Sequence, residues 1–278
     1  MVNLLHDGIP LENEYVELIK SNDFKTIESF SDSFLLNNMS LFKHNAYKWV
    51  KDPFHQWSRQ WEYPYVYNKV REVAEKGAEL NVLDAGSGVT FFPYYLSNEL
   101  SDSNIHCCDY DDLEKTFDEI NSQLNKKIKF LNSDLRSLPY ERESFHVIYC
   151  ISVLEHTNEY ERIIDEFYRL LRPGGSLVIT FDISLDGTRD IAVGKGEKLL
   201  KSLVKRFPGY DSAQSLSVDA LRSDIFTTLK AGDMNRDLLP WRLPSFLYQL
   251  KTFVSTRRFV SWPPPLTVFC LSLVKPSE

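Results

Sequence analysis

A short apolar segment that runs directly into a glycine-containing turn constrains the fold of this chain more than any other feature. Residues 81–85, with the sequence NVLDA, suit a buried strand, and Gly86-Ser87-Gly88 follow at once. Glycines permit a tight turn and allow the backbone to approach a ligand closely. The segment predicts either a ligand-binding turn between a strand and a helix or only a sharp connection between them.

The turn lacks the third glycine that a dinucleotide site needs. In the motif G-x-G-x-x-G that glycine lets the helix pack on the strand beneath a pyrophosphate. This sequence has Phe91 at the corresponding position. A bulky ring there disfavours a pyrophosphate but leaves room for a ligand without phosphate. A nicotinamide-dependent oxidoreductase is therefore the alternative of a different class, and Phe91 counts against it.

Further apolar segments alternate with helical patterns along the middle of the chain, which is typical of βαβ units in a parallel sheet. The expected strands are residues 104–109, 128–131, 145–150, 176–181 and, near the end of the chain, 266–274. Residues 160–171 carry the apolar stripe of a helix, and residues 172–175 (RPGG) predict a turn. We divide the chain into a helical segment, a ligand-binding α/β core and a closing segment of helices and strand. These parts are residues 1–77, 78–183 and 184–278.

Two acidic residues stand at the ends of expected strands. Asp109 ends the second strand about 21 residues after Gly88, where a carboxylate can accept hydrogen bonds from both ribose hydroxyls. Asp134 follows the third strand, where it could accept from the exocyclic amine of adenine. Because the carboxyl ends of parallel strands share one edge, these side chains are expected at one ligand site.

These segments together resemble the class I S-adenosylmethionine-dependent methyltransferases, in the branch that includes ubiquinone-biosynthesis-type and other small-molecule methyltransferases. The motifs that carry the resemblance are LDAGSG, CDY, NSDLRSLPY, FHVIYCISVLEHT and LLRPGGSLVIT, all within residues 62–183. The resemblance implies a Rossmann-like, seven-stranded, mostly parallel sheet with a reversed last strand. It also implies S-adenosylmethionine over the strand ends and a small-molecule acceptor.

The resemblance further assigns contacts to the cofactor. Gly86, Ser87, Gly88 and Ile151 would lie near its methionine part, Asp109 would hold the ribose, and Asp134 and Leu135 would hold the adenine. Asp84 would brace the glycine turn. Tyr110 is either a ring stacked on adenine or a surface residue. Arg59 and Tyr63 could reach the cofactor carboxylate, since arginine offers bidentate pairing.

Two residues are candidates for the chemical step. A sulfonium donor is already activated, so the protein mainly supplies alignment and excludes water. An oxygen acceptor must also lose a proton, and imidazole is a suitable base near neutral pH. His156, just after the fourth strand, is this base or only a brace for its loop. Asp182, at the end of the fifth strand, is the second candidate.

The sequence does not favour a metal site. In ubiquinone-type relatives an acid three residues before the Glu155-His156 pair completes a divalent-metal site, and this chain has Ser152 there. The cysteines have no zinc-site spacing, and their apolar surroundings predict buried, reduced thiols. They are Cys107, Cys108, Cys150 and Cys270.

All five tryptophans fall outside the core segment. They are Trp49, Trp57, Trp61, Trp241 and Trp262. Such rings either line an acceptor pocket in a helical, aromatic-rich cap or fill the interior of that cap.

Charge and hydropathy limit the expected partners. The net charge of −7 disfavours nucleic acid, which requires clustered cations. The N-terminus has no basic start of a signal peptide, and no apolar run is long enough to span a membrane, so we expect a cytoplasmic protein without a membrane partner. Residues 195–206 predict a basic amphipathic helix. A solvated face is favoured for it, and contact with an anionic substrate or a membrane surface is the weaker alternative. A non-catalytic, cofactor-binding regulator is the third functional alternative.

Overall fold

A seven-stranded sheet organises the structure, a computed structural model that describes residues 5–44, 52–75, 79–157, 159–189, 191–210, 216–241, 245–256 and 261–277. The strands are β1 (Leu80–Ala85), β2 (Ser103–Asp109), β3 (Lys129–Asn132), β4 (Phe145–Ile151), β5 (Leu171–Ser184), β6 (Ile191–Ala192) and β7 (Leu266–Val274). Their order is β3-β2-β1-β4-β5-β6, with β7 antiparallel to β5 and the other pairs parallel. The predicted mostly parallel sheet with a reversed last strand is confirmed.

The chain reverses its direction of travel across the sheet between β1 and β4. From β1 it proceeds outward through β2 to β3, and then returns to place β4 on the other side of β1. In open α/β sheets the crevice at the carboxyl ends of the strands forms at such a switch point, and ligands bind there. The topology therefore places the expected site between the ends of β1 and β4.

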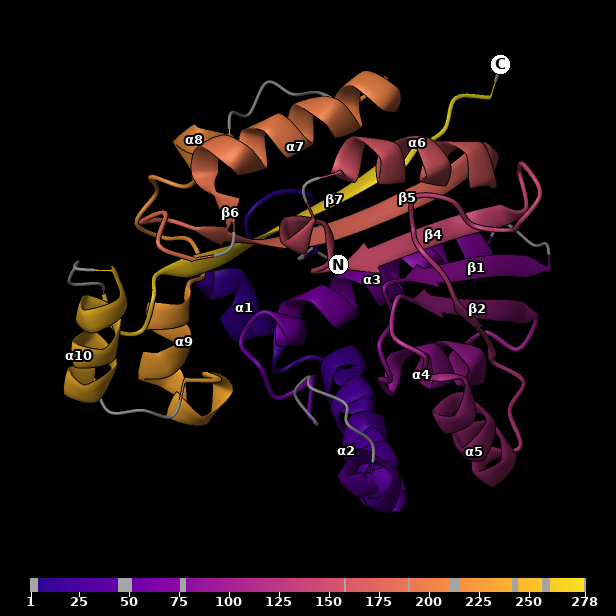
Figure 1. The fold of residues 1–278 in the computed structure, drawn as a ribbon, viewed down its shortest axis with the longest axis horizontal. Coiled ribbons are helices and arrows are strands. Elements are labelled where there is room, and N and C mark those ends of the chain that lie inside the picture. Colours follow the sequence, from indigo (N-terminus) through magenta and orange to yellow (C-terminus); the bar gives the residue numbers. More distant parts are fainter. Residues whose placement is uncertain are drawn as a thin grey trace.

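Helices cover both faces of the sheet (Figure 1). On one face lie α6 (Tyr160–Leu170) and α7 (Val193–Arg206), and on the other lie α3 (Arg59–Ala74), α4 (Phe92–Glu99) and α5 (Glu114–Leu124). The remaining helices are α1 (Glu12–Leu18), α2 (Asn22–His44), α8 (Leu216–Asp219), α9 (Thr228–Met234), α10 (Ser245–Thr256) and the 3₁₀ turns η1 (Leu154–His156) and η2 (Arg236–Leu238). Two hydrophobic cores result, one on each side of the sheet.

Helix α3 is buried on nearly every side. Trp61, Tyr65 and Val66 are fully buried, and the charged Glu62 is buried with them. The helix contacts β4, β5 and β7 on one side and α2 on another. A helix enclosed in this way needs no polar face, which explains why this segment is so rich in rings.

The predicted turn at residues 172–175 lies inside a strand. β5 begins at Leu171, which pairs with Phe145, and the register then shifts before Val147 pairs with Ser176. Gly174 adopts a φ of 75°, and its N–H donates to the carbonyl of Lys275 just after β7. Turn-forming residues thus build a bulge, because β7 supplies partners that keep the chain in the sheet.

Other sequence expectations have definite outcomes. All four cysteines are free and buried, as predicted. In α7 the basic side chains Lys195, Lys198 and Lys201 are exposed while the apolar residues face inward, which confirms the amphipathic helix. Among the described residues, no helix is both long and apolar enough to cross a membrane.

The tryptophans divide into two groups. Trp57 and Trp61 are buried in the hydrophobic core, which favours interior filling over pocket lining for both. Trp241 and Trp262 are half-buried and meet edge to face at 6.4 Å between ring centroids. Trp49 and the predicted boundary at residue 77 lie outside the described residues.

Candidate functional site

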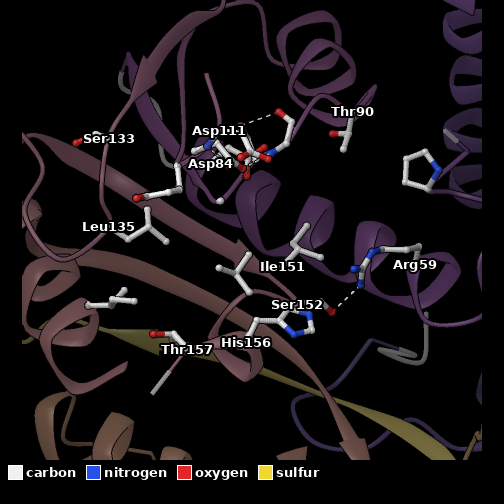
Figure 2. Close-up of a pocket in the computed structure, with 18 of the residues that line it drawn as sticks. Arg59, Asp84, Thr90, Asp111, Ser133, Leu135, Ile151, Ser152, His156 and Thr157 are labelled. Atoms are coloured by element: carbon white, nitrogen blue, oxygen red, sulfur yellow. Dashed lines mark hydrogen bonds between the residues drawn. The ribbon is translucent and has the colours of Figure 1, made fainter. Parts of the chain in front are cut away.

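A cavity of about 780 Å³ opens at the carboxyl ends of β1, β2, β3 and β4. Figure 2 shows Arg59 and Ser152 at one side of it and Ser133 and Leu135 at the other. Its lining includes every residue that the sequence suggested for cofactor binding, together with His156. These residues are Arg59, Tyr63, Gly86, Ser87, Gly88, Asp109, Tyr110, Asp134, Leu135 and Ile151. The structure thus brings together residues from α3, four strand ends and the loops after them.

The backbone N–H groups of the glycine turn donate hydrogen bonds to other atoms of the protein. The N–H groups of Gly86 and Ser87 both donate to the carbonyl of Cys108, at 2.9 and 3.0 Å. The N–H of Gly88 donates to the Oδ2 atom of Asp109 at 2.8 Å. An anion-binding turn directs its N–H groups at the ligand. This turn therefore suits a ligand part without phosphate, in agreement with the expectation drawn from Phe91.

Gly86 has to be glycine at this point of the turn. Its φ is 80°, and a Cβ atom added there would lie 2.6 Å from Cγ2 of Val153. Both the left-handed backbone and the close approach exclude a side chain. The turn is therefore held against the segment after β4, and both parts line the same cavity.

Asp109 joins the glycine turn to the end of β2. Its Oδ2 atom accepts from Gly88, and its Oδ1 atom accepts from the N–H of Asp111 at 3.0 Å. Each oxygen of a carboxylate can accept more than one hydrogen bond. The carboxylate is therefore fixed in orientation and keeps capacity for two further donors, such as a pair of hydroxyls.

Asp134 has a partner that the sequence analysis did not foresee. Its carboxylate accepts from Nε of Arg136, at 2.9 Å to each oxygen, and Oδ1 also accepts from the backbone N–H of Arg136. Hydrogen bonding to this guanidinium lowers the pKa of Asp134. Arg136 itself lines the cavity. The site therefore offers a pre-oriented carboxylate with a planar cation beside it.

A buried hydrogen-bond network connects α3 to the sheet. Nη1 of Arg59 donates to both Glu62 and the hydroxyl of Ser152, the latter at 2.6 Å. The hydroxyls of Ser152 and Thr180 in turn donate to Oε1 of Glu62. Burial lowers the pKa of Arg59, but the nearby Glu62, Tyr63 and Asp182 together outweigh burial, and the net shift is upward. The sequence suggested only Arg59; an acid three residues later on a helix was the signal for its partner.

Two further acids, Glu155 in η1 and Asp182 near the end of β5, lie close together. The backbone N–H of Asp182 donates to Oε1 of Glu155 at 3.3 Å, and Oε2 of Glu155 is buried. Burial raises the pKa of Glu155 well above its usual range, and the charge of Asp182 raises it further. Asp182, a predicted catalytic residue, is not among the described residues that line the cavity, whereas His156 is exposed and lines it.

Asp84 is the buried acid nearest to the glycine turn. It lines the base of the cavity and is almost completely enclosed. Burial raises the pKa of Asp84 to about 8, and the charge of Asp109 also raises it. Its carboxyl group is therefore largely protonated at neutral pH. In the part of the chain that the structure describes, no group of three His, Cys, Asp or Glu residues could hold a metal ion.

Residues from outside the predicted core complete the wall. Pro53 and Gln56 precede α3, and Pro240 follows η2. All three line the same cavity as the glycine turn. Both terminal segments of the chain therefore contribute to one site.

The middle of the chain is similar to known methyltransferases. The profile of a family described as a methyltransferase domain matches residues 83–179. Methyltransferase GfsG of Streptomyces halstedii is 28% identical over 184 residues, which cover 62% of this chain and 62% of that protein. The sterol 24-C-methyltransferase of Schizosaccharomyces pombe is 26% identical over 136 residues, covering 45% of this chain and 34% of that protein. The demethylmenaquinone methyltransferase of Lactococcus lactis is 29% identical over 102 residues, covering 36% of this chain and 40% of that protein.

Solved structures share the fold. The [4+2]-cyclase SpnF superposes with a TM-score of 0.51 at 17% identity, covering 81% of this chain and 85% of that one. The chain spans about a third to three fifths of the length of the curated relatives named above.

Proposed function

We propose, from the match of residues 83–179 to the profile of a methyltransferase domain, that this chain transfers a methyl group from S-adenosylmethionine to a small-molecule acceptor. The observation that carries the proposal is the glycine turn. Its three backbone N–H groups already donate hydrogen bonds to Cys108 and Asp109. The turn therefore suits a ligand that has no pyrophosphate at this position. A nicotinamide dinucleotide would need those donors.

The cavity residues fit S-adenosylmethionine by their chemistry. Asp109 has acceptor capacity for the two ribose hydroxyls, and Asp134 with Leu135 offers an acceptor and an apolar surface for adenine. Arg59 uses one nitrogen for its two hydrogen bonds within the protein, and a guanidinium has five N–H donors. It can therefore also pair with the carboxylate of the methionine part, beside Tyr63 and the glycine turn.

We assign the acceptor to the part of the cavity near His156. The segments 1–77 and 184–278 act as a cap in this proposal, because Pro53, Gln56 and Pro240 bring both of them to the cavity wall. The names of two relatives specify a sterol and demethylmenaquinone as acceptors, which supports an apolar, ring-containing molecule here. We propose oxygen as the acceptor atom, since an imidazole base stands at this part of the site.

Bound S-adenosylmethionine supplies a methyl group that its sulfonium already activates. Tyr63, Ile151 and Val153 provide an apolar wall that keeps water from the reacting atoms. His156 accepts the proton of the acceptor hydroxyl on a ring nitrogen as the oxygen becomes nucleophilic. Asp182 is not among the residues that line the cavity in the described part of the chain. In this proposal it has a positioning role, because its backbone N–H donates to Glu155.

Two measurements on the purified chain test the proposal. Calorimetry with S-adenosylhomocysteine should give saturable heat, and NADH fluorescence should remain unchanged on addition of the protein. Incubation with methyl-tritiated S-adenosylmethionine and a panel of hydroxylated ring compounds should then label one of them. If the protein gave neither heat nor a thermal shift with S-adenosylhomocysteine, the cofactor assignment would be wrong. Binding without transfer to any acceptor would instead favour the regulatory alternative.

A further inference from the structure

Helix α10 presents an apolar face to the outside of the protein. Phe246, Leu250 and Val254 are 66%, 60% and 76% exposed. They lie four residues apart, so they form one stripe along the helix, and Leu247 widens it. α10 lies at the outer end of the molecule, away from the sheet (Figure 1). Isolated exposed apolar residues are common on proteins, but a continuous helical face of them indicates a binding surface.

The opposite side of α10 packs on the protein. Tyr248 is 5% exposed, and its ring lies 4.5 Å from that of Trp262 between centroids. Its hydroxyl accepts a hydrogen bond from Nη2 of Arg189 at 2.5 Å. The helix is therefore attached through one side and leaves its other side without cover among the described residues.

The sequence around α10 is cationic in a chain that is acidic overall. From Leu238 to Trp262 there is no aspartate or glutamate, although the whole chain has 39 acidic residues and a net charge of −7. The same stretch contains Arg242, Lys251, Arg257 and Arg258. An apolar helical face within a local excess of Lys and Arg is the composition of helices that lie in an anionic bilayer interface.

Two half-buried tryptophans flank the helix in the sequence. Trp241 precedes it and Trp262 follows it, and their rings meet edge to face. Trp262 also packs on Tyr248, on the side of α10 that faces the protein. The two indole rings therefore help to hold the helix in place, and its outer face is formed by Phe246, Leu250 and Val254.

We propose that α10 docks the protein on an anionic lipid bilayer, with Phe246, Leu250 and Val254 inserted at the boundary of headgroups and acyl chains. The charge argues against a second copy of this chain as the occupant. A symmetric dimer through α10 would bring the two cationic stretches together and add repulsion. The helix lies on the membrane and does not span it. The proposal thus departs from the sequence-based expectation of no membrane partner, which rested on the lack of a long apolar run.

Docking through α10 would also place the cavity near the lipid. Pro240 lines the cavity and precedes the start of α10 by five residues, which span at most about 18 Å of extended chain. A lipid-soluble molecule could then enter without crossing much water. The docking proposal itself goes beyond the proposed function and does not require it, since it is tested by binding alone.

Vesicle flotation with the full chain tests the proposal. Phosphatidylcholine vesicles with about one third phosphatidylserine should carry the protein upward. Pure phosphatidylcholine vesicles should carry at most about one tenth of that amount of protein. The variant Leu250→Gln with Val254→Gln should lower the partition coefficient at least about tenfold. Salt at about 1 M should weaken binding to the anionic vesicles, because it screens the cations.

Matched controls separate α10 from general effects. Val218→Gln with Leu221→Gln, the α8 variant, removes two exposed apolar side chains, one in α8 and one just after it, and should leave flotation unchanged. Arg257→Gln with Arg258→Gln should reduce binding to anionic vesicles, whereas Arg142→Gln with Lys198→Gln, which removes two exposed cations elsewhere, should not. Circular dichroism and thermal unfolding verify that each variant is folded.

Three results would overturn the docking proposal. The first is that the native protein floats with neither vesicle. The second is equal loss of binding in the α8 variant and the α10 variant. The third is a dimer in sedimentation analysis that the α10 variant dissociates, which would make this face a contact between copies. Failure to bind S-adenosylhomocysteine would affect only the proposed enzyme function, because flotation needs no cofactor.

Discussion

The guanidinium of Arg59, at the start of α3, donates a hydrogen bond of 2.6 Å to the hydroxyl of Ser152, immediately after β4. Both residues line the cavity, and both hydrogen-bond to Glu62. Ser152 has a φ of 49°, an unusual value for a residue with a side chain. The first helix layer and the sheet edge are thus joined at the point where the methionine part of the cofactor is proposed to bind.

Glu62→Gln should destabilise the protein strongly. The carboxylate is fully buried and offsets the charge of Arg59, so its removal leaves a buried cation without its counter-charge. Breaking such a pair costs about 3–5 kcal/mol in free energy of unfolding. The control is Glu17→Gln, whose pair with Lys20 is exposed and should contribute less than about 1 kcal/mol. Urea denaturation measures the loss in free energy of unfolding for each variant. Equal losses in the two variants would contradict the prediction that the buried Glu62 pair stabilises the fold more than an exposed pair does.

Gly86→Ala should impair both folding and cofactor binding. The substitution forces a side chain into a backbone with φ of 80° and brings its Cβ to 2.6 Å from Val153. The left-handed backbone alone costs about 1–2 kcal/mol. Gly194→Ala in α7 is the matched control, because a Cβ there meets nothing within 4 Å. Thermal unfolding should show a lower Tm for the first variant and an unchanged or higher Tm for the second.

Asp84→Asn should change how stability depends on pH. The pKa of Asp84 rises from 3.8 to about 8 on folding, mainly because of burial. Between these values the folded chain holds a proton that the unfolded chain has lost, so the native protein becomes less stable as pH increases. This contribution is at most about 1.4 kcal/mol per pH unit, and the variant lacks it. Denaturation between about pH 5 and about pH 8 should therefore show a flatter profile for the variant; parallel profiles would refute the raised pKa.

Asp109→Asn should weaken binding of S-adenosylhomocysteine. The substitution removes the negative charge that the ribose hydroxyls would contact, and a hydrogen bond to a charged group contributes about 1.5–3 kcal/mol. The expected loss in affinity is about tenfold to a hundredfold. Asp118→Asn, on the exposed surface of α5, removes the same charge without touching the cavity and should bind normally. Calorimetry on both variants makes the comparison, and an unaltered Kd for the first would remove Asp109 from the ribose site.

His156→Gln should lower kcat and leave S-adenosylhomocysteine affinity unchanged. A general base contributes about 10²–10⁴-fold to the rate of proton removal. The rise of kcat with pH that reports the imidazole should disappear in the variant. If kcat and its pH profile stayed as in the native protein, His156 would be a brace for the η1 loop, the other interpretation of its position.

The sequence alone predicted six of the seven strands and the order of the ligand-facing loops, but not the two-residue strand β6. The predicted strands contain short apolar runs, and the glycine turn, Asp109 and Asp134 stand at or just after strand ends, so their common edge results from parallel topology alone. These features are local, because a few neighbouring residues suffice to define a strand and its end. The same local logic failed at residues 172–175, where pairing with the distant β7 converts an expected turn into a bulge.

The tertiary structure alone decided which polar groups meet. Ser152 and Thr180 lie 90 and 118 residues from Glu62, and no spacing rule connects them. No spacing rule predicts the hydrogen bonds of the N–H groups in the glycine turn either. Nor does one predict that Asp182 hydrogen-bonds to Glu155 instead of lining the cavity. Which side of α10 packs inward was likewise set by Tyr248, Trp262 and Arg189. Hydrogen bonds and burial depend on distances of a few ångströms between remote segments, and those distances exist only once the helices have packed on the sheet.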